Sequence, residues 1–131
     1  MAKNLLILTN NPKVIADFGK LNHQVCDTYE QVLLQTRDRI HTGSCLLMHP
    51  LAGSVKPGES PYRSVVIDHQ DDFLDMRSLE IIEGAIDRFN TMTAVPRDRF
   101  YNEKTLADFQ LIDFELLTSA LTAIDPNLLR E

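Results

Sequence analysis

The chain contains several short, mostly apolar runs that are bounded by polar turn residues. They lie at residues 5–8, 44–48 and 64–67. Runs of this length without strict alternation are typical of strands buried on both faces of a sheet. A weaker strand is expected at residues 24–26. The pattern therefore predicts four strands.

Between the strands, apolar residues recur every three or four positions, the spacing that places them on one face of a helix. Capping residues mark where these helices begin, and glycine or proline marks most of their ends. The expected helices begin at Pro12, Thr28, Met76 and Asn102, and they end near Gly19, Gly43, Asn90 and Ile124.

The resulting order, β-α-β-α-β-β-α-α, predicts a single small α/β domain over residues 1–131. Its four-stranded sheet should be at least partly parallel and covered by helices. The 44% hydrophobic content suits one core in a chain of 131 residues. The pattern leaves the strand order and the direction of the fourth strand open.

Charge and composition exclude several classes of partner. The net charge of -6 opposes nucleic-acid binding, which needs a positive face against the phosphates. No segment approaches the roughly 20 apolar residues of a membrane span, and the start leads into a strand rather than a signal peptide. We expect a cytoplasmic protein without a membrane or nucleic-acid partner. Cys26 and Cys45 lie in strand-like runs, where reduced, buried thiols are expected.

The segment from His49 to Arg63 is the most unusual part of the chain. It contains three of the six prolines and two of the five glycines, so it should form a shaped loop between two strands. Its formal charges are Lys56, Glu59 and Arg63, a net positive balance in an acidic protein. That balance favours a small anion over a polyanion.

This loop and the segment from Thr9 to Lys13 each follow a predicted strand, so they should meet at one edge of the sheet. A helix N-terminus in the second segment would add free N–H groups. We predict a crevice there that binds a carboxylate or phosphate. The predicted ligand-binding residues are Thr9, Asn10, Asn11, His49, Ser54, Lys56, Ser60, Tyr62 and Arg63.

Other chemistries fit the residues less well. Gly53 and Gly58 nearly match a phosphate-binding loop, but Glu59 replaces the essential lysine and the segment leads into a strand rather than a helix. His49 is a candidate general base toward Ser54 or a bound ligand, yet no third orienting group is apparent, so no catalytic residue is assigned. The acidic turn at residues 68–72 lacks a defined ligand spacing, and neither a metal nor a cofactor is expected.

Three segments in order carry a family resemblance. They are Leu8-Thr9-Asn10-Asn11-Pro12, Arg37-Asp38-x-Ile40-His41-x-Gly43, and the run from Leu47 to Pro57 continued by Pro61-Tyr62-Arg63-Ser64. Together they resemble the GrdX family, small proteins encoded beside components of glycine, sarcosine and betaine reductase. The resemblance covers roughly the first half of the chain.

The resemblance implies an accessory or regulatory role in amino-acid reduction and brings no catalytic residues with it. The leading hypothesis is therefore a cytoplasmic accessory protein that binds a small anionic, amino-acid-like ligand in the predicted crevice. The alternatives are a small enzyme that uses His49 as a general base, and an assembly partner that docks on a larger reductase complex. A protein partner and a second copy of this chain remain open as partners.

Overall fold

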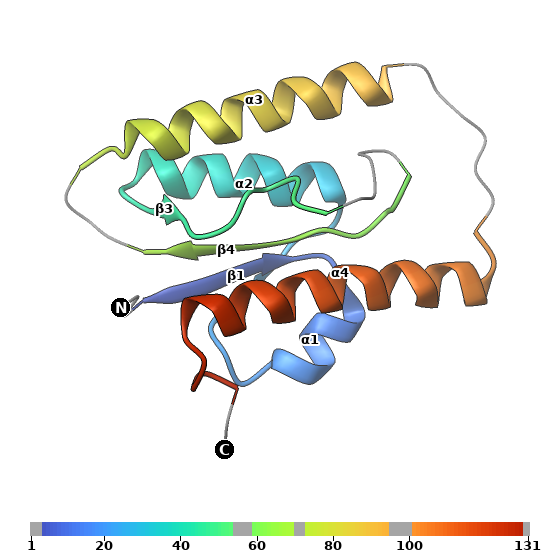
Figure 1. The fold of residues 1–131 in the computed structure, drawn as a ribbon. Coiled ribbons are helices and arrows are strands. Elements are labelled where there is room, and N and C mark those ends of the chain that lie inside the picture. The colour runs from blue at the N-terminus through green and yellow to red at the C-terminus, as the bar shows by residue number, and fades with distance from the viewer. Residues whose placement is uncertain (1–3, 54–58, 70–72, 95–100, 130–131) are drawn as a thin grey trace.

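Residues 4–53, 59–69, 73–94 and 101–129, which the computed structural model describes, form strands and helices in the predicted order (Figure 1). The class is α/β, as expected. The elements are β1 (Leu5–Thr9), α1 (Pro12–Phe18), β2 (His23–Val25), α2 (Tyr29–His41), β3 (Cys45–Leu46), β4 (Ser64–Asp68), α3 (Met76–Thr93) and α4 (Glu103–Ile124).

The sheet is mixed, with the strand order β2-β1-β4-β3. β1 and β2 are parallel, whereas β4 is antiparallel to both of its neighbours. The direction of β4, which the sequence left open, agrees with its connection to β3, because the described residues of that connection, 47–53 and 59–63, contain no helix of the kind that a parallel crossover usually has. Thr9 at the end of β1 therefore lies opposite Ser64 at the start of β4.

Helices cover both faces of this sheet (Figure 1). Alternate residues of the strands point to opposite faces. On one face, Ile7 and Val66 pack with Leu117 and other apolar residues of α1 and α4. On the other face, Leu8 and Val65 belong to a cluster with Val32 of α2. Both faces of the central strands are thus buried, which explains their continuous apolar runs.

α3 adds an outer layer, because it packs on α2 (Figure 1). Leu33 and Ile40 of α2 form a cluster with Ile82 and Ile86 of α3. The aromatic rings of Tyr29 and Phe89 stack at one end of this contact, with centroids 5.3 Å apart.

Several element bounds differ from the expectation. β3 has only two residues instead of five, and it is an edge strand that pairs with β4 alone. Short edge strands limit unwanted pairing with other chains. α3 continues to Thr93, past the predicted end at Asn90, and β2 begins at His23. The other helices end within a few residues of the predicted positions.

Candidate functional site

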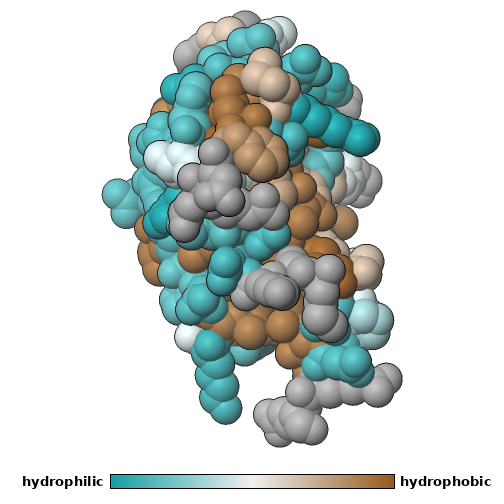
Figure 2. Space-filling view, turned by 90° about the vertical axis from the view of Figure 1, so that its left-hand side faces the viewer, coloured by the Kyte–Doolittle hydropathy of each residue, from teal (hydrophilic) through white to brown (hydrophobic). Residues whose placement is uncertain are grey.

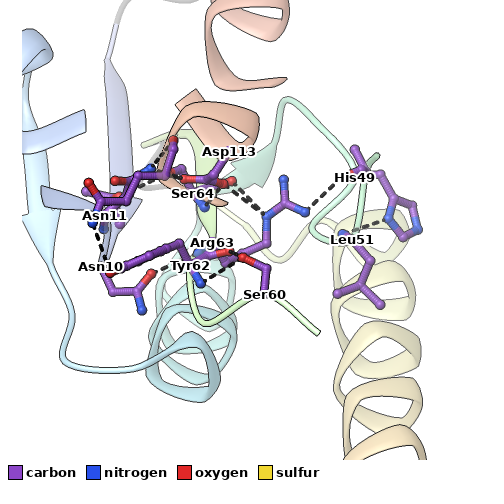
Figure 3. Close-up of polar contacts among 12 residues, drawn as sticks. Asn10, Asn11, His49, Leu51, Ser60, Tyr62, Arg63, Ser64 and Asp113 are labelled. Atoms are coloured by element: carbon purple, nitrogen blue, oxygen red, sulfur yellow. Dashed lines mark hydrogen bonds and ion pairs between the residues drawn. The ribbon is translucent and has the colours of Figure 1, made fainter. Parts of the chain in front are cut away.

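A buried polar network joins the end of β1, the start of β4 and the middle of α4 (Figure 3). The hydroxyls of Thr9 and Ser64 are 2.7 Å apart and hydrogen-bonded. The Asp113 carboxylate accepts hydrogen bonds from Ser64 N at 2.9 Å and Ser64 Oγ at 2.7 Å. Thr9 and Ser64 are fully buried, and Asp113 is 4% exposed. Buried polar groups of this kind are expected to be hydrogen-bonded to one another.

Asn11 connects this network to α1. Its side-chain oxygen accepts a hydrogen bond from Lys13 N, which makes it the N-cap of α1, and Pro12 occupies the first turn. Its Nδ2 donates to Asp113 Oδ2 and to the backbone oxygen of Gln110, both at 2.9 Å. Because its amide is used within the protein and the residue is fully buried, Asn11 fixes α4 against the sheet.

Asn10 ties the two predicted loops together. Its Oδ1 accepts a hydrogen bond from Arg63 N at 2.8 Å, and its Nδ2 donates to the Pro61 backbone oxygen at 2.7 Å. Ser60 Oγ accepts from Tyr62 N at 3.1 Å and shapes the turn, and the Tyr62 hydroxyl accepts from Gln110 Nε2 at 3.0 Å. The prediction that these two segments meet at one edge of the sheet agrees with these contacts.

Arg63 is the charged centre of this region and is only 4% exposed. Its Nη1 donates to the Ala52 backbone oxygen at 2.8 Å and closes the base of the long loop (Figure 3). Its Nε donates to the Ser64 backbone oxygen and lies 3.8 Å from Asp113 Oδ1. Nη2 is buried and has no partner with hydrogen-bond geometry among the described residues. Such an orphaned donor is uncommon and calls for an explanation.

A small hollow borders the Arg63 side chain. It has a volume of about 10 Å³, enough for about one water molecule. Its walls include Tyr29, Ser60 and Tyr62. The same three residues line a much larger, open pocket of about 780 Å³, so the hollow and the pocket share a wall. We refer to the larger space as the aromatic pocket, because Tyr29, Tyr62, Phe89 and Tyr101 line it.

The aromatic pocket lies between the start of α2, the end of α3 and the turn before β4. Asp27 and Glu30 contribute carboxylates, and the N-cap Thr28 accepts a hydrogen bond from Gln31 N. The Tyr101 hydroxyl donates to the Glu59 backbone oxygen at 2.6 Å and so holds this turn in place. Burial raises the pKa of the Tyr29 phenol, and the positive charge of nearby Arg63 and a hydrogen-bonding interaction with its side chain oppose this rise.

His49 lies elsewhere. It is exposed, and its Nδ1 accepts a hydrogen bond from Leu51 N at 3.0 Å, within its own turn (Figure 3). It borders a separate hollow of about 430 Å³ beside α3, whose lining includes Glu80 and Arg88. The structure therefore places His49 apart from the pocket that Asn10, Ser60 and Tyr62 line. Its proposed role as a general base stays a prediction.

The nine predicted ligand-binding residues thus fall into different surroundings. Thr9 and Asn11 are buried in the polar network, whereas Asn10, Ser60 and Tyr62 reach the aromatic pocket and Arg63 lies behind its wall. Ser54 and Lys56 lie outside the described residues.

Two residues that sequence reasoning missed organise the site. Asp113 carries the carboxylate that faces Arg63, and Tyr29 separates Arg63 from the aromatic pocket. Asp113 could have been noticed, because it falls four residues from both Phe109 and Leu117, on the apolar face of its helix. A carboxylate at such a position is expected to have a buried partner. No comparable pattern in the sequence indicated that Tyr29 would lie beside Arg63.

Other features of the described residues bear on the predicted chemistry. No group of three or more His, Cys, Asp or Glu side chains among them is arranged to hold a metal ion. None of the described helices is both long and apolar enough to cross a membrane.

Cys26 is buried and Cys45 partly buried, and both are free thiols. Burial raises the pKa of Cys26 to about 11 and also raises the pKa of Cys45.

A comparison with models of known protein families shows to which family the chain is related. The family model described as GrdX-like protein matches residues 6–122. The chain belongs to the GrdX-like family. The match extends well past the first half, where the three resembling segments lie, and reaches the last turn of α4. Both Arg63 and Asp113 therefore fall within the region that this GrdX-like protein shares with its family. No curated protein and no solved structure matches the chain.

Proposed function

We propose that this GrdX-like protein is a cytoplasmic accessory or regulatory protein of glycine-reductase-type amino-acid metabolism, and that it binds a small carboxylate-bearing ligand beside Arg63. The observation that carries the proposal is the buried Nη2 of Arg63, which meets no acceptor with full hydrogen-bond geometry among the described residues. Family membership supports the accessory role, and the aromatic pocket next to Arg63 supports ligand binding.

A carboxylate suits this position for electrostatic reasons. An unsatisfied buried donor costs about 1–3 kcal/mol, and more when it is charged, so a ligand oxygen at Nη2 recovers that cost. Asp113 already faces the Nε side of the guanidinium and neutralises part of its charge. One further negative charge is therefore better matched than the two charges of a phosphate.

The shape of the site defines how the ligand enters. The hollow beside Arg63 holds about one water molecule, so the ligand carboxylate contacts Nη2 either through that water or after a small rotation of Tyr62. The remainder of the ligand then lies in the aromatic pocket, close to Asn10 and Ser60. Thr9 and Asn11 position this site from within the buried network and do not contact the ligand in this arrangement.

Binding is tested by calorimetric titration of the full chain with 3-phenylpropionate, a carboxylate whose ring fits the aromatic pocket. The Arg63→Lys variant retains a positive charge beside Asp113 but lacks Nη2, and we expect its affinity to fall about tenfold, the effect of about 1.4 kcal/mol. Arg37→Lys is the matched control, because Arg37 forms a surface ion pair with Glu83. Nitrogen-15 NMR of the Arg63 side chain in the unmodified protein should shift on binding.

An unchanged Arg63 resonance at saturating 3-phenylpropionate, or equal affinities of Arg63→Lys and Arg37→Lys, would refute the carboxylate site. A water molecule would then be the partner of Nη2. The accessory role has a separate test, in which the protein is added to a purified glycine-reductase-type system. We expect the rate of substrate reduction to change, and no change over a range of protein concentrations would contradict this part of the proposal.

A further inference from the structure

The charges around the aromatic pocket do not suit a purely anionic molecule. Two carboxylates, Asp27 and Glu30, line the pocket, and no lysine or arginine does so among the described residues. A ligand with only a carboxylate would enter a pocket whose own charges are negative and repel it. The body of the ligand therefore needs a positive group that faces Asp27 and Glu30.

Aromatic side chains in the same pocket favour a positive group as well. Tyr29 and Phe89 stack on each other, and Tyr62 and Tyr101 contribute two more rings to the lining. The face of an aromatic ring attracts an ammonium group through the quadrupole of the ring. Tyr and Phe also supply apolar surface against which a hydrocarbon body packs.

The place for a negative ligand group and the place for a positive one lie in two adjacent hollows that share a wall. Tyr29, Ser60 and Tyr62 line both the aromatic pocket and the hollow at Arg63. A ligand bound across this shared wall would have one end near Arg63 and its other end near the carboxylates of Asp27 and Glu30 in the aromatic pocket. At about 780 Å³, the pocket is also much larger than a two-carbon amino acid requires.

From this arrangement, we propose that the ligand is a zwitterion with an apolar body, of the size of a large α-amino acid. Its carboxylate faces Nη2 of Arg63, its ammonium group lies near Asp27 and Glu30, and its apolar body packs on the aromatic rings. This inference builds on the proposed function, which supplies only the carboxylate. It adds the cationic group and the size of the ligand.

Three matched probes separate the two charges, namely phenylalanine, 3-phenylpropionate and phenethylammonium. The last two are phenylalanine without its ammonium group and without its carboxylate. Calorimetric titration of the full chain should give phenylalanine an affinity at least tenfold higher than either probe with one charge, because each of those probes lacks one charged contact with the protein.

The variant Asp27→Asn/Glu30→Gln removes both pocket carboxylates without changing side-chain shape. We expect its affinity for phenylalanine to fall about tenfold and its affinity for 3-phenylpropionate to rise, because the repulsion is removed. Asp38→Asn/Glu115→Gln is the control, since it removes two exposed carboxylates that do not line the pocket.

The outcomes distinguish this inference from the proposed function. Tighter binding of phenylalanine that depends on Asp27 and Glu30 supports the zwitterion. Equal binding of phenylalanine and 3-phenylpropionate, both sensitive to Arg63→Lys, refutes the zwitterion and leaves the carboxylate site standing. Binding of phenethylammonium as tight as that of phenylalanine also refutes it. If none of the three probes binds, the inference and the carboxylate site both fail.

Discussion

Asp113 in the middle of α4 holds Ser64 at the start of β4 by two hydrogen bonds, one from the backbone N–H at 2.9 Å and one from the hydroxyl at 2.7 Å. The two residues are 49 positions apart in the sequence. The same carboxylate lies 3.8 Å from Nε of Arg63. A single side chain thus positions both the first residue of a central strand and the buried arginine of the candidate site.

Replacing Asp113 by asparagine should strongly destabilise the protein. The change removes the negative charge beside Arg63, and breaking a buried pair by removing one partner costs about 3–5 kcal/mol. Chemical denaturation of the variant measures the loss. Asp108→Asn on the same helix is the control, because Asp108 is exposed and its pair with Lys104 spans 3.9 Å at the surface. A similar stability of the two variants would contradict the role assigned to Asp113.

Two asparagines that cap helices allow the stability due to capping to be measured apart from the stability due to the buried polar network. Asn102 caps α4 at the surface, and its replacement by alanine should cost about 1 kcal/mol. Asn11→Ala should cost about 1–3 kcal/mol more, because it also removes the hydrogen bonds that Asn11 Nδ2 donates to the buried Asp113 Oδ2 and to the Gln110 oxygen, and leaves Ser64 as the donor to that Oδ2. The free energies of unfolding of the two variants provide the comparison. Equal losses would show that the Asn11 contacts to α4 add nothing.

Gly53 and Gly84 should respond to alanine in opposite directions. Gly53 has φ of +113°, and an added Cβ would lie 2.5 Å from Leu116 Cδ1, so Gly53→Ala should destabilise the protein by about 1–3 kcal/mol. Gly84 lies in α3 with nothing within 4 Å of an added Cβ, so alanine there should stabilise by about 0.5–1 kcal/mol. Thermal unfolding of both variants tests this contrast, which a lower melting temperature for Gly84→Ala would contradict.

Alkaline pH should destabilise the folded state through Cys26. Its pKa is raised by burial from 9.0 to about 11. Because the unfolded chain loses this proton first, the stabilising effect is complete below pH 9 and is lost as the pH rises through about 11. Denaturation of the wild type and of Cys26→Ala over this range gives the contribution of the thiol. Parallel pH profiles for the two proteins would exclude it.

The same shift predicts that the native thiol reacts slowly. Near pH 8, about one thousandth of Cys26 is thiolate, the form that attacks alkylating reagents. We expect slow alkylation in the native protein and fast alkylation after denaturation, followed by mass spectrometry. Rapid native labelling of Cys26 would show that the pocket around this sulfur opens readily.

The helices and strands of this fold could be predicted from the sequence, because their physical causes are local. Apolar runs defined the central strands β1 and β4, and the capping residues Asn11, Thr28 and Asn102 begin three helices where they were expected. The α/β class followed from the order of the elements, and the edge where two loops meet followed from the direction of the strands before them. Family membership was likewise readable from motifs in the first half of the chain.

Which polar residues are buried together depends on how the helices and strands pack, and the sequence did not predict it. Asp113, Arg63 and Ser64 come from distant parts of the chain, and their contact depends on how α4 packs across the end of β4. The same packing buries Thr9 and Asn11, which were predicted to contact the ligand. It also places His49 beside a hollow other than the aromatic pocket. Local sequence patterns cannot specify such contacts. A carboxylate and a guanidinium attract each other strongly only in the low-dielectric interior, and that interior exists only after separate elements have packed together.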